Sequence, residues 1–412
     1  MLRVFGRIGV LSFGGPAAQI ALMHRELVEQ RPWLTEQSYL RALSLCMLLP
    51  GPEAMQLATY AGWRLRGVGG GLLAGGLFVL PGAVVIAALL AIYVTWGSVP
   101  LVQAAFLGIK AAVIVIVLAA LRGLAKRALT GWADWLVAGF SFAAIFAIGL
   151  PFPLILALAA LWGAVQAKAT PEAALPAARP DWGHTARTAA IWGTLWLAPL
   201  ALLSLSGAGL LAQIGWFFAW LATISFGGAY ALLAYMAQTV IGDFGWITPA
   251  QMIDALGLAE TTPGPLILVT QFVAMLTAHS QGGFAMALMA AGIGLWATFM
   301  PCFLWIFVAA PHVERLSGAP RLTGALSGIT AAVVGVILNL SVWFALNVFF
   351  GRMRPAPDIL PALTLPELGS VNGAALILFT VAALAFFVAR LPLAAMLAFS
   401  ALAGGVLALV GL

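Results

Sequence analysis

Two short motifs in this chain combine residue types that can hold an anion. SFGG occurs at 12–15 and again at 225–228, and PGP occurs at 50–52 and again at 263–265. Glycines let the backbone approach an oxyanion closely, and a proline inside an apolar helix interrupts it at a cost of about 3 kcal/mol. A helix that restarts after the break presents unpaired N–H groups and the positive end of its dipole. The motifs therefore predict an oxyanion site at broken helices.

The candidate substrate-binding residues are the glycines of these motifs, the neutral hydrogen-bonding side chains beside them, and one lysine. They are Ser12, Gly14, Gly15, Gly51, Gln56, Lys110, Ser225, Gly227, Gly228, Thr261, Thr262 and Gly264. The alternative explanation is a set of proline kinks and small residues at tight helix contacts, both common in membrane bundles. Four breaks at two repeated pairs of positions favour a binding site.

Three charged residues lie in or beside the apolar segments. Lys110 is close to the centre of the segment 99–121, where a lysine is expected to serve function, here as a direct partner of a dianion. The alternatives are an ion pair with Glu53 or an ammonium that reaches a solvated cavity. Glu53 follows the first PGP, and Glu260 precedes the second. Each carboxylate either caps a helix start, the simpler explanation for Glu260, or serves proton coupling or ion pairing.

The composition requires a membrane. Of the 412 residues, 63% are hydrophobic and only 8% are charged, and the mean hydropathy is +1.07. Soluble domains carry about 25% charged residues. Apolar segments of about 20 residues, long enough to cross a bilayer, recur along the chain, and they lack the alternation of a transmembrane barrel. We therefore predict an all-α polytopic membrane protein.

The same residues argue against several other classes of protein. The net charge is +6, but Lys and Arg flank apolar segments, as orientation signals do, so we expect no nucleic-acid partner. The two cysteines and four histidines are scattered without metal-binding or redox spacing, so we expect no metal and no cofactor. A membrane enzyme needs a nucleophile, a general base or a metal set near one interface, which this sequence does not offer.

The chain contains one unit twice. SFGG and PGP recur at an offset of 213 residues, and GIKAAV (108–113) recurs as GITAAV (328–333) at an offset of 220. Chance similarity would not hold one register across separate motifs, so we infer an internal duplication. The predicted organisation is an N-terminal repeat (1–167), a cytoplasmic linker (168–186), a connecting transmembrane helix (187–208) and a C-terminal repeat (209–412).

The basic residues predict that the two repeats have inverted topology. Arg64 and Arg66 precede the apolar segment 70–95, and further basic residues follow the segment 99–121, which places both ends in the cytoplasm. In the second repeat the turn itself carries Arg315 and Arg321, so there the turn lies inside. The segments 3–63 and 216–277 are either full spans or re-entrant hairpins. Hairpins keep more of the basic residues in the cytoplasm and are favoured.

The quoted motifs also carry a family resemblance. LSFGGPAAQIALMHRELVEQRPWL (11–34), LCMLLPGPEAMQLATYAGW (45–63) and LFVLPGA (77–83) resemble the chromate ion transporter family, in its long two-domain form. SFGGAYALL and TTPGPLILVTQF resemble the C-terminal half of that family. The resemblance implies export of chromate across the bacterial inner membrane and chromate resistance, with sulfate as a competing tetrahedral dianion.

The residues alone indicate an anion transporter with inverted repeats, without specifying chromium. A transporter of sulfate or another oxyanion therefore stays open, as does an anion channel. The expected partners are the oxyanion and the lipid bilayer, and a homodimer is an open alternative to a single chain.

Overall fold

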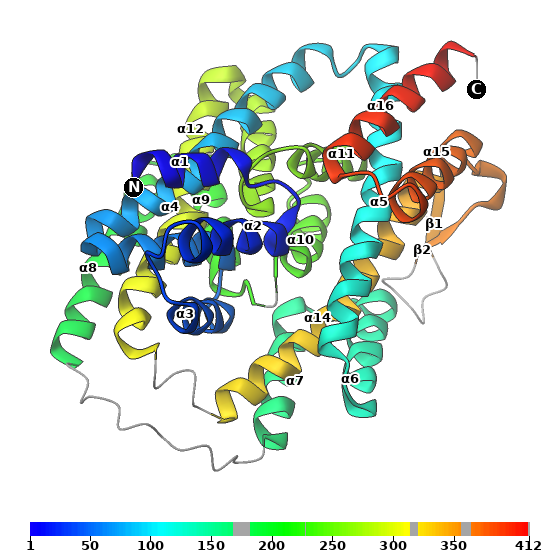
Figure 1. The fold of residues 1–412 in the computed structure, drawn as a ribbon. Coiled ribbons are helices and arrows are strands. Elements are labelled where there is room, and N and C mark those ends of the chain that lie inside the picture. The colour runs from blue at the N-terminus through cyan, green and yellow to red at the C-terminus, as the bar shows by residue number, and fades with distance from the viewer. Residues whose placement is uncertain (168–181, 227, 314–319, 356–363, 411–412) are drawn as a thin grey trace. The chain divides into compact units, whose positions relative to one another are not determined.

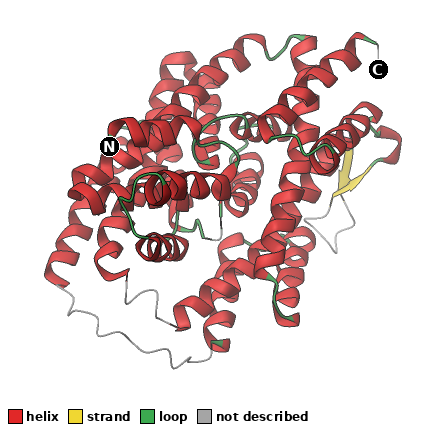
Figure 2. Ribbon diagram, in the orientation of Figure 1, coloured by secondary structure: helices red, strands yellow, loops and turns green. Residues whose placement is uncertain are grey.

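The computed structural model describes residues 1–167, 182–226, 228–313, 320–355 and 364–410 (Figure 1). Apart from one small two-stranded sheet, the regular structure of these residues is helical (Figure 2). Most of the predicted linker, 168–181, and the candidate Gly227 lie outside the described residues. Five of the described helical segments are long and apolar enough to cross a membrane: Glu53–Trp96, Pro100–Ala128, Trp182–Leu205, Leu266–His312 and Pro320–Phe349. The prediction of an all-α polytopic membrane protein is confirmed.

The elements of the two repeats follow one order. The first repeat contains α1 (Leu2–Leu11), α2 (Gly15–His24), η1 (Arg25–Glu29), α3 (Glu36–Leu48), α4 (Glu53–Trp96), α5 (Pro100–Ala128), α6 (Trp132–Ala143), η2 (Ala144–Ile148) and α7 (Phe152–Gln166). After α8 (Trp182–Leu205), the second contains α9 (Gly209–Thr223), α10 (Ala229–Gln238), η3 (Thr239–Asp243), α11 (Pro249–Glu260), η4 (Leu266–Leu268), α12 (Val269–Ala309), η5 (Ala310–His312), α14 (Pro320–Phe349), α15 (Gly373–Ala383), η7 (Leu384–Val388) and α16 (Leu393–Leu409). An antiparallel pair, β1 (Met353–Pro355) and β2 (Thr364–Pro366), and a short turn, η6 (Leu368–Ser370), are inserted before α15. The inverted orientation of the repeats stays a prediction.

Helices end at all four motifs. The breaks separate α1 from α2, α3 from α4, α9 from α10, and α11 from η4 and α12. Each break contains a glycine with positive φ: Gly14 (87°), Gly51 (122°), Gly228 (104°) and Gly264 (94°). A side chain strains the backbone in this region, so the glycines are required by the turn.

The first break reverses the chain direction. The guanidinium of Arg7 on α1 lies 3.6 Å from the carboxylate of Glu26 on η1, and the rings of Phe5 and Trp33 are 6.3 Å apart. Uninterrupted helix would separate residues 7 and 26 by about 28 Å. The helices α1 and α2 therefore fold back on one another.

The longest helices, α4 and α12, each contain a tight turn. Gly67 (φ 60°, ψ −155°) interrupts α4, and Gly283 (φ 65°, ψ −160°) interrupts α12 in the same conformation. In α4 the two arms return along each other, because a Cβ on Gly62 would overlap the backbone of Gly70 beyond the turn. The predicted span 70–95 corresponds to the second arm.

The described residues form two compact units. One comprises Met1–Leu90, Ala167–Leu232 and Thr262–Thr323, and the other comprises Ala91–Gln166, Leu233–Thr261 and Gly324–Leu412. Both repeats therefore contribute to each unit.

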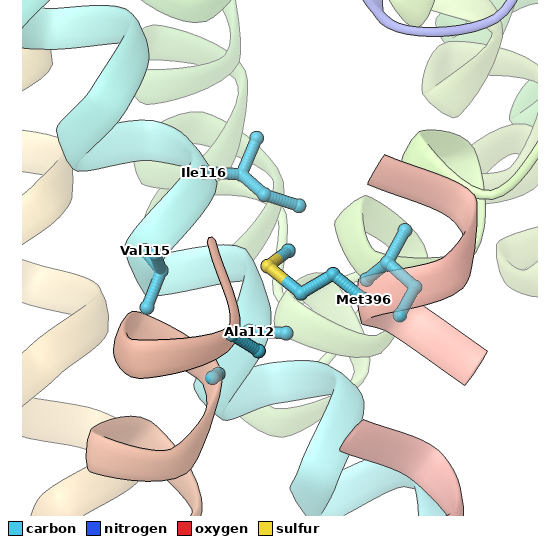
Figure 3. Packing of buried hydrophobic residues seen from close by; sticks show 7 residues of the cluster. Ala112, Val115, Ile116 and Met396 are labelled. Carbon is cyan, nitrogen blue, oxygen red and sulfur yellow. The ribbon is translucent and has the colours of Figure 1, made fainter. Parts of the chain in front are cut away.

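In the second unit, α5 packs against α15 and α16. Ala112, Val115 and Ile116 on its buried face belong to one hydrophobic cluster with Met396 on α16 (Figure 3). Nearby, a Cβ on Gly404 would overlap the carbonyl oxygen of Ala104, so the helix backbones are almost in contact. Small residues at such positions let membrane helices pack without a cavity.

Replacing Gly404 by alanine should lower the melting temperature in detergent. The added methyl group has no room against α5, and such overpacking costs about 1–3 kcal/mol. Gly405→Ala is the matched control, since the nearest atom to its Cβ is the Leu101 side chain at 3.5 Å. The control should melt at the wild-type temperature or above, because alanine favours helix by up to about 1 kcal/mol. Equal melting of both variants would contradict the close packing.

His24 joins the end of α2 to the start of α3. Its Nε2 lies 2.7 Å from Glu36 Oε2, and its Nδ1 lies 3.0 Å from Glu29 Oε1. The hydrogen bond to Glu36 raises the pKa of His24 above the usual 6.5, against an opposing effect of burial. The imidazolium is therefore favoured in the folded protein.

This linkage predicts a pH-dependent contribution to stability. Because the folded pKa of His24 is raised, the contribution is complete below about pH 6.5 and is lost as pH rises through the folded pKa. It should amount to at most about 1 kcal/mol after solvent screening. Melting temperatures between about pH 5.5 and 8.5 should show His24→Gln losing this dependence. His279→Gln, which removes a ring contact to Phe284, should keep it; a His24→Gln profile that matches wild type would exclude the linkage.

Candidate functional site

The four breaks are joined in two pairs, and each pair takes one motif from each repeat. Gly51 of the first PGP donates its N–H to the carbonyl oxygen of Ser225 in the second SFGG, at 2.9 Å. Gly264 of the second PGP donates in the same way to Ser12 in the first SFGG, at 2.8 Å. The two bonds are equivalent under the duplication. All four residues lie in the first compact unit.

Side chains beside the breaks bind the interrupted backbone. The buried amide of Gln19 donates to the carbonyl oxygens of Ser12, at 3.2 Å, and Gly264, at 2.7 Å. Gln56 Nε2 donates to Pro50, at 2.7 Å, and the Ser12 hydroxyl donates to Ile8, at 2.6 Å. Buried backbone groups need such partners. Sequence reasoning missed Gln19, whose only signal was a polar side chain four residues after SFGG.

These bonds change the expected role of several candidates. The N–H groups of Gly51 and Gly264 and the Ser12 hydroxyl have protein partners, so in this conformation they do not face an anion. Gln56 Oε1 is buried and has no hydrogen-bond partner among the residues that the structure describes. An acceptor oxygen suits a donor and not an oxyanion.

The pair formed by the first PGP and the second SFGG encloses little space. A cavity of about 10 Å³ is lined there by Gly51, Pro52, Ser225, Thr270 and Thr298, together with apolar side chains. This volume suffices for about one water molecule. This pair of breaks therefore has no room for a tetrahedral oxyanion in the structure.

Other candidates lie at the helix ends. Gly14 precedes α2 and Gly15 begins it, Gly228 precedes α10, and Thr262 is buried in the second PGP turn. Thr261 donates its hydroxyl to the carbonyl oxygen of Leu258, at 2.7 Å.

The two glutamates occupy opposite ends of their helices. Glu53 is the first residue of α4, where a carboxylate complements the helix dipole. Glu260 is the last residue of α11. The capping interpretation of Glu260 is therefore wrong, because the chain leaves the helix there and the next helical turn begins only at Leu266.

Lys110 belongs to the second compact unit, where it pairs with an acidic residue that sequence reasoning missed. Its Nζ lies 3.0 Å from Asp254 Oδ1, and Tyr93 donates its hydroxyl to Asp254 Oδ2 at 3.0 Å. The sequence offered one signal for Asp254, which is a difference in charge between the repeats. Asp254 lies six residues after the N-cap Thr248, and the equivalent position after Thr35 in the first repeat is Arg41.

Comparison with known proteins identifies the family. The family model described as "Chromate transporter" matches residues 1–164 and 212–406. The "Probable chromate transport protein" of Synechococcus elongatus is 33% identical over 344 residues, which are 83% of each chain. The "Chromate transport protein" of Cupriavidus metallidurans is 31% identical over 84% of this chain and 82% of its own, and that of Pseudomonas aeruginosa is 32% identical over 81% and 77%. No solved structure matches. The family model matches both halves of the chain, and each half contains the same set of broken helices. The chain belongs to the chromate transporter family.

Proposed function

We propose that this protein is a secondary transporter that exports chromate across the bacterial inner membrane and so confers chromate resistance. The observation that carries the proposal is the pair of equivalent hydrogen bonds that join SFGG of each repeat to PGP of the other. Broken helices at a repeat interface are the usual place for a transporter's substrate site. The family, whose relatives are named for chromate transport, supplies the substrate.

The substrate site would form at the breaks when these pairs open. The first-turn N–H groups of α2 and α4 have no acceptor within their helices, and they carry the positive end of the dipole. Gly14, Gly15 and Gly228 leave room for an oxyanion beside this backbone. Each crossed bond links the two repeats within the first compact unit, so a movement of one repeat's helices against the other's inside that unit would change both bonds together.

The membrane potential alone can drive the export of a dianion. Moving one charge through 100 mV is worth about 2.3 kcal/mol, so a cell that is negative inside drives each dianion outward with about 4.6 kcal/mol at 100 mV. Proton coupling through Glu53 is compatible with this cycle but is not required by it.

Inside-out vesicles should test transport directly. With an imposed potential that is positive inside, vesicles containing the protein should accumulate chromate above vesicles without it, because the dianion moves toward the positive side. Accumulation of sulfate without chromate would make the protein a sulfate transporter. Flux that persists after a cross-link locks the repeats together would indicate a channel.

Gly51→Ala should reduce this transport at least about tenfold, since Gly51 has positive φ and a left-handed backbone costs a residue with a side chain about 1–2 kcal/mol. The new Cβ would also lie 2.8 Å from Gln56 Nε2. Gly6→Ala on α1 is the matched control, because its Cβ meets no atom within 4 Å. Initial rates at equal protein content would decide, and a wild-type rate for Gly51→Ala would remove this break from the transport cycle.

A further inference from the structure

A largely buried charged cluster around Asp254 joins three helices in the second compact unit. Lys110 comes from α5, Asp254 from α11 and Tyr93 from the end of α4. The ammonium lies 3.0 Å from one carboxylate oxygen, and the phenol donates to the other at 3.0 Å. The Asp254 side chain is 8% exposed and that of Lys110 is 19% exposed. Charges within such apolar helices are costly and usually serve function.

The helix backbones are shaped to bring this cluster together. Gly257 lies one turn after Asp254 on α11, and a Cβ there would come within 2.6 Å of the Ile109 side chain on α5. Ile109 directly precedes Lys110, so the glycine lets α11 approach α5 beside the ion pair. The pairing follows from helix packing, and it does not depend on a flexible loop.

Both charged groups retain unused bonding capacity. Lys110 Nζ carries three N–H donors, and Asp254 is its one ion-pair partner in the part of the chain that the structure describes. Asp254 Oδ1 is buried, and apart from the ion pair with Lys110 at 3.0 Å it has no further partner among the described residues. The lysine has donors left for an oxyanion, and the carboxylate has a position left for a proton.

The cluster breaks the symmetry of the duplicated chain. At the position equivalent to Asp254 the first repeat has Arg41, and at the position equivalent to Lys110 the second repeat has Thr330. A pair needed only to hold the shared fold together would be expected in both copies. A single pair suits a role that is exercised once in each transport cycle.

We infer that Asp254 is a proton-binding residue that controls whether Lys110 can bind the oxyanion, an inference that rests on the proposed function. The ionised carboxylate competes with the oxyanion for the ammonium. When Oδ1 takes a proton from water, Asp254 becomes neutral, and Lys110 keeps its positive charge and binds the dianion. When the oxyanion leaves, the proton returns to water and the ion pair reforms. One proton therefore accompanies each dianion, and one net negative charge moves per cycle.

The other groups around Asp254 are compatible with this role. Lys110 on α5 and Tyr93 on α4 are the polar groups in contact with its carboxylate among the described residues. The hydroxyl of Tyr93 favours the ionised form, because it donates to that form. On α11 itself, Glu260 lies six residues further along the helix.

Proton uptake on chromate binding tests the inference without transport. Purified wild-type protein in weakly buffered detergent at about pH 8 should take up about one more proton per bound chromate than Asp254→Asn. The comparison between variants is needed because chromate itself takes up a proton near neutrality. Asp254→Asn should also bind chromate about tenfold more tightly at this pH, since the competing carboxylate is gone. Lys110→Met should weaken chromate binding in both backgrounds, because the ammonium is lost.

One control and a second readout complete the test. Asp134→Asn, on the exposed start of α6, should match wild type. Tyr93→Phe should move the pH midpoint of chromate binding upward, because the ionised carboxylate loses a hydrogen bond. This variant serves if Asp254→Asn does not fold.

Equal proton uptake by wild type and Asp254→Asn, or an unshifted midpoint in Tyr93→Phe, would overturn the inference, as would failure of wild type to bind chromate. Binding with proton uptake but without vesicle transport would instead refute the proposed function alone.

Discussion

An interrupted helix inside a membrane protein must find partners for its free backbone groups, and this constraint governs the first compact unit. Lipid offers no hydrogen bonds, so each unpaired N–H or C=O group there costs several kcal/mol. The duplication supplies the missing partners: Gly51 donates to Ser225, and Gly264 donates to Ser12. The left-handed glycines give each break the shape that these bonds need, and Gln19 binds both carbonyls of one pair. The breaks are thus mutually dependent, which explains why both repeats contribute to the same compact unit.

The ion pair of Lys110 and Asp254 obeys a different constraint. Either charge alone would be expensive among apolar helices, and the partner offsets much of that cost. The two-fold pattern of the breaks is not repeated here, since the positions equivalent to Asp254 and Lys110 are Arg41 and Thr330. The backbone hydrogen bond between SFGG and PGP therefore occurs twice. The ion pair of Lys110 and Asp254 has no equivalent at the corresponding positions of the other repeat. In the proposed mechanism, the breaks allow the movement and the ion pair sets how much charge moves.

Local chemistry made much of the helical layout predictable. Proline and glycine placed the four breaks, and the threonines before α3 and α11 cap those helices as equivalent residues. Other features could not be predicted from neighbouring residues alone. The turn at Gly67 divides α4 into two arms, although no proline marks it. Glu260 precedes a PGP motif in sequence, yet it ends a helix, because a residue near a break can belong to either side.

The sequence by itself determined the membrane class, the duplication, the positions of the breaks and the family resemblance, because each depends on composition or on residues close together in the chain. Only the tertiary structure decided which groups meet. Ser12 and Gly264 are 252 residues apart, and Lys110 and Asp254 are 144 apart. Their pairing depends on how whole helices pack, and a buried donor accepts whichever partner the packing delivers. For this reason the N–H groups of Gly51 and Gly264 and the Ser12 hydroxyl are bound within the protein. Asp254, which no motif marked, is the partner of Lys110.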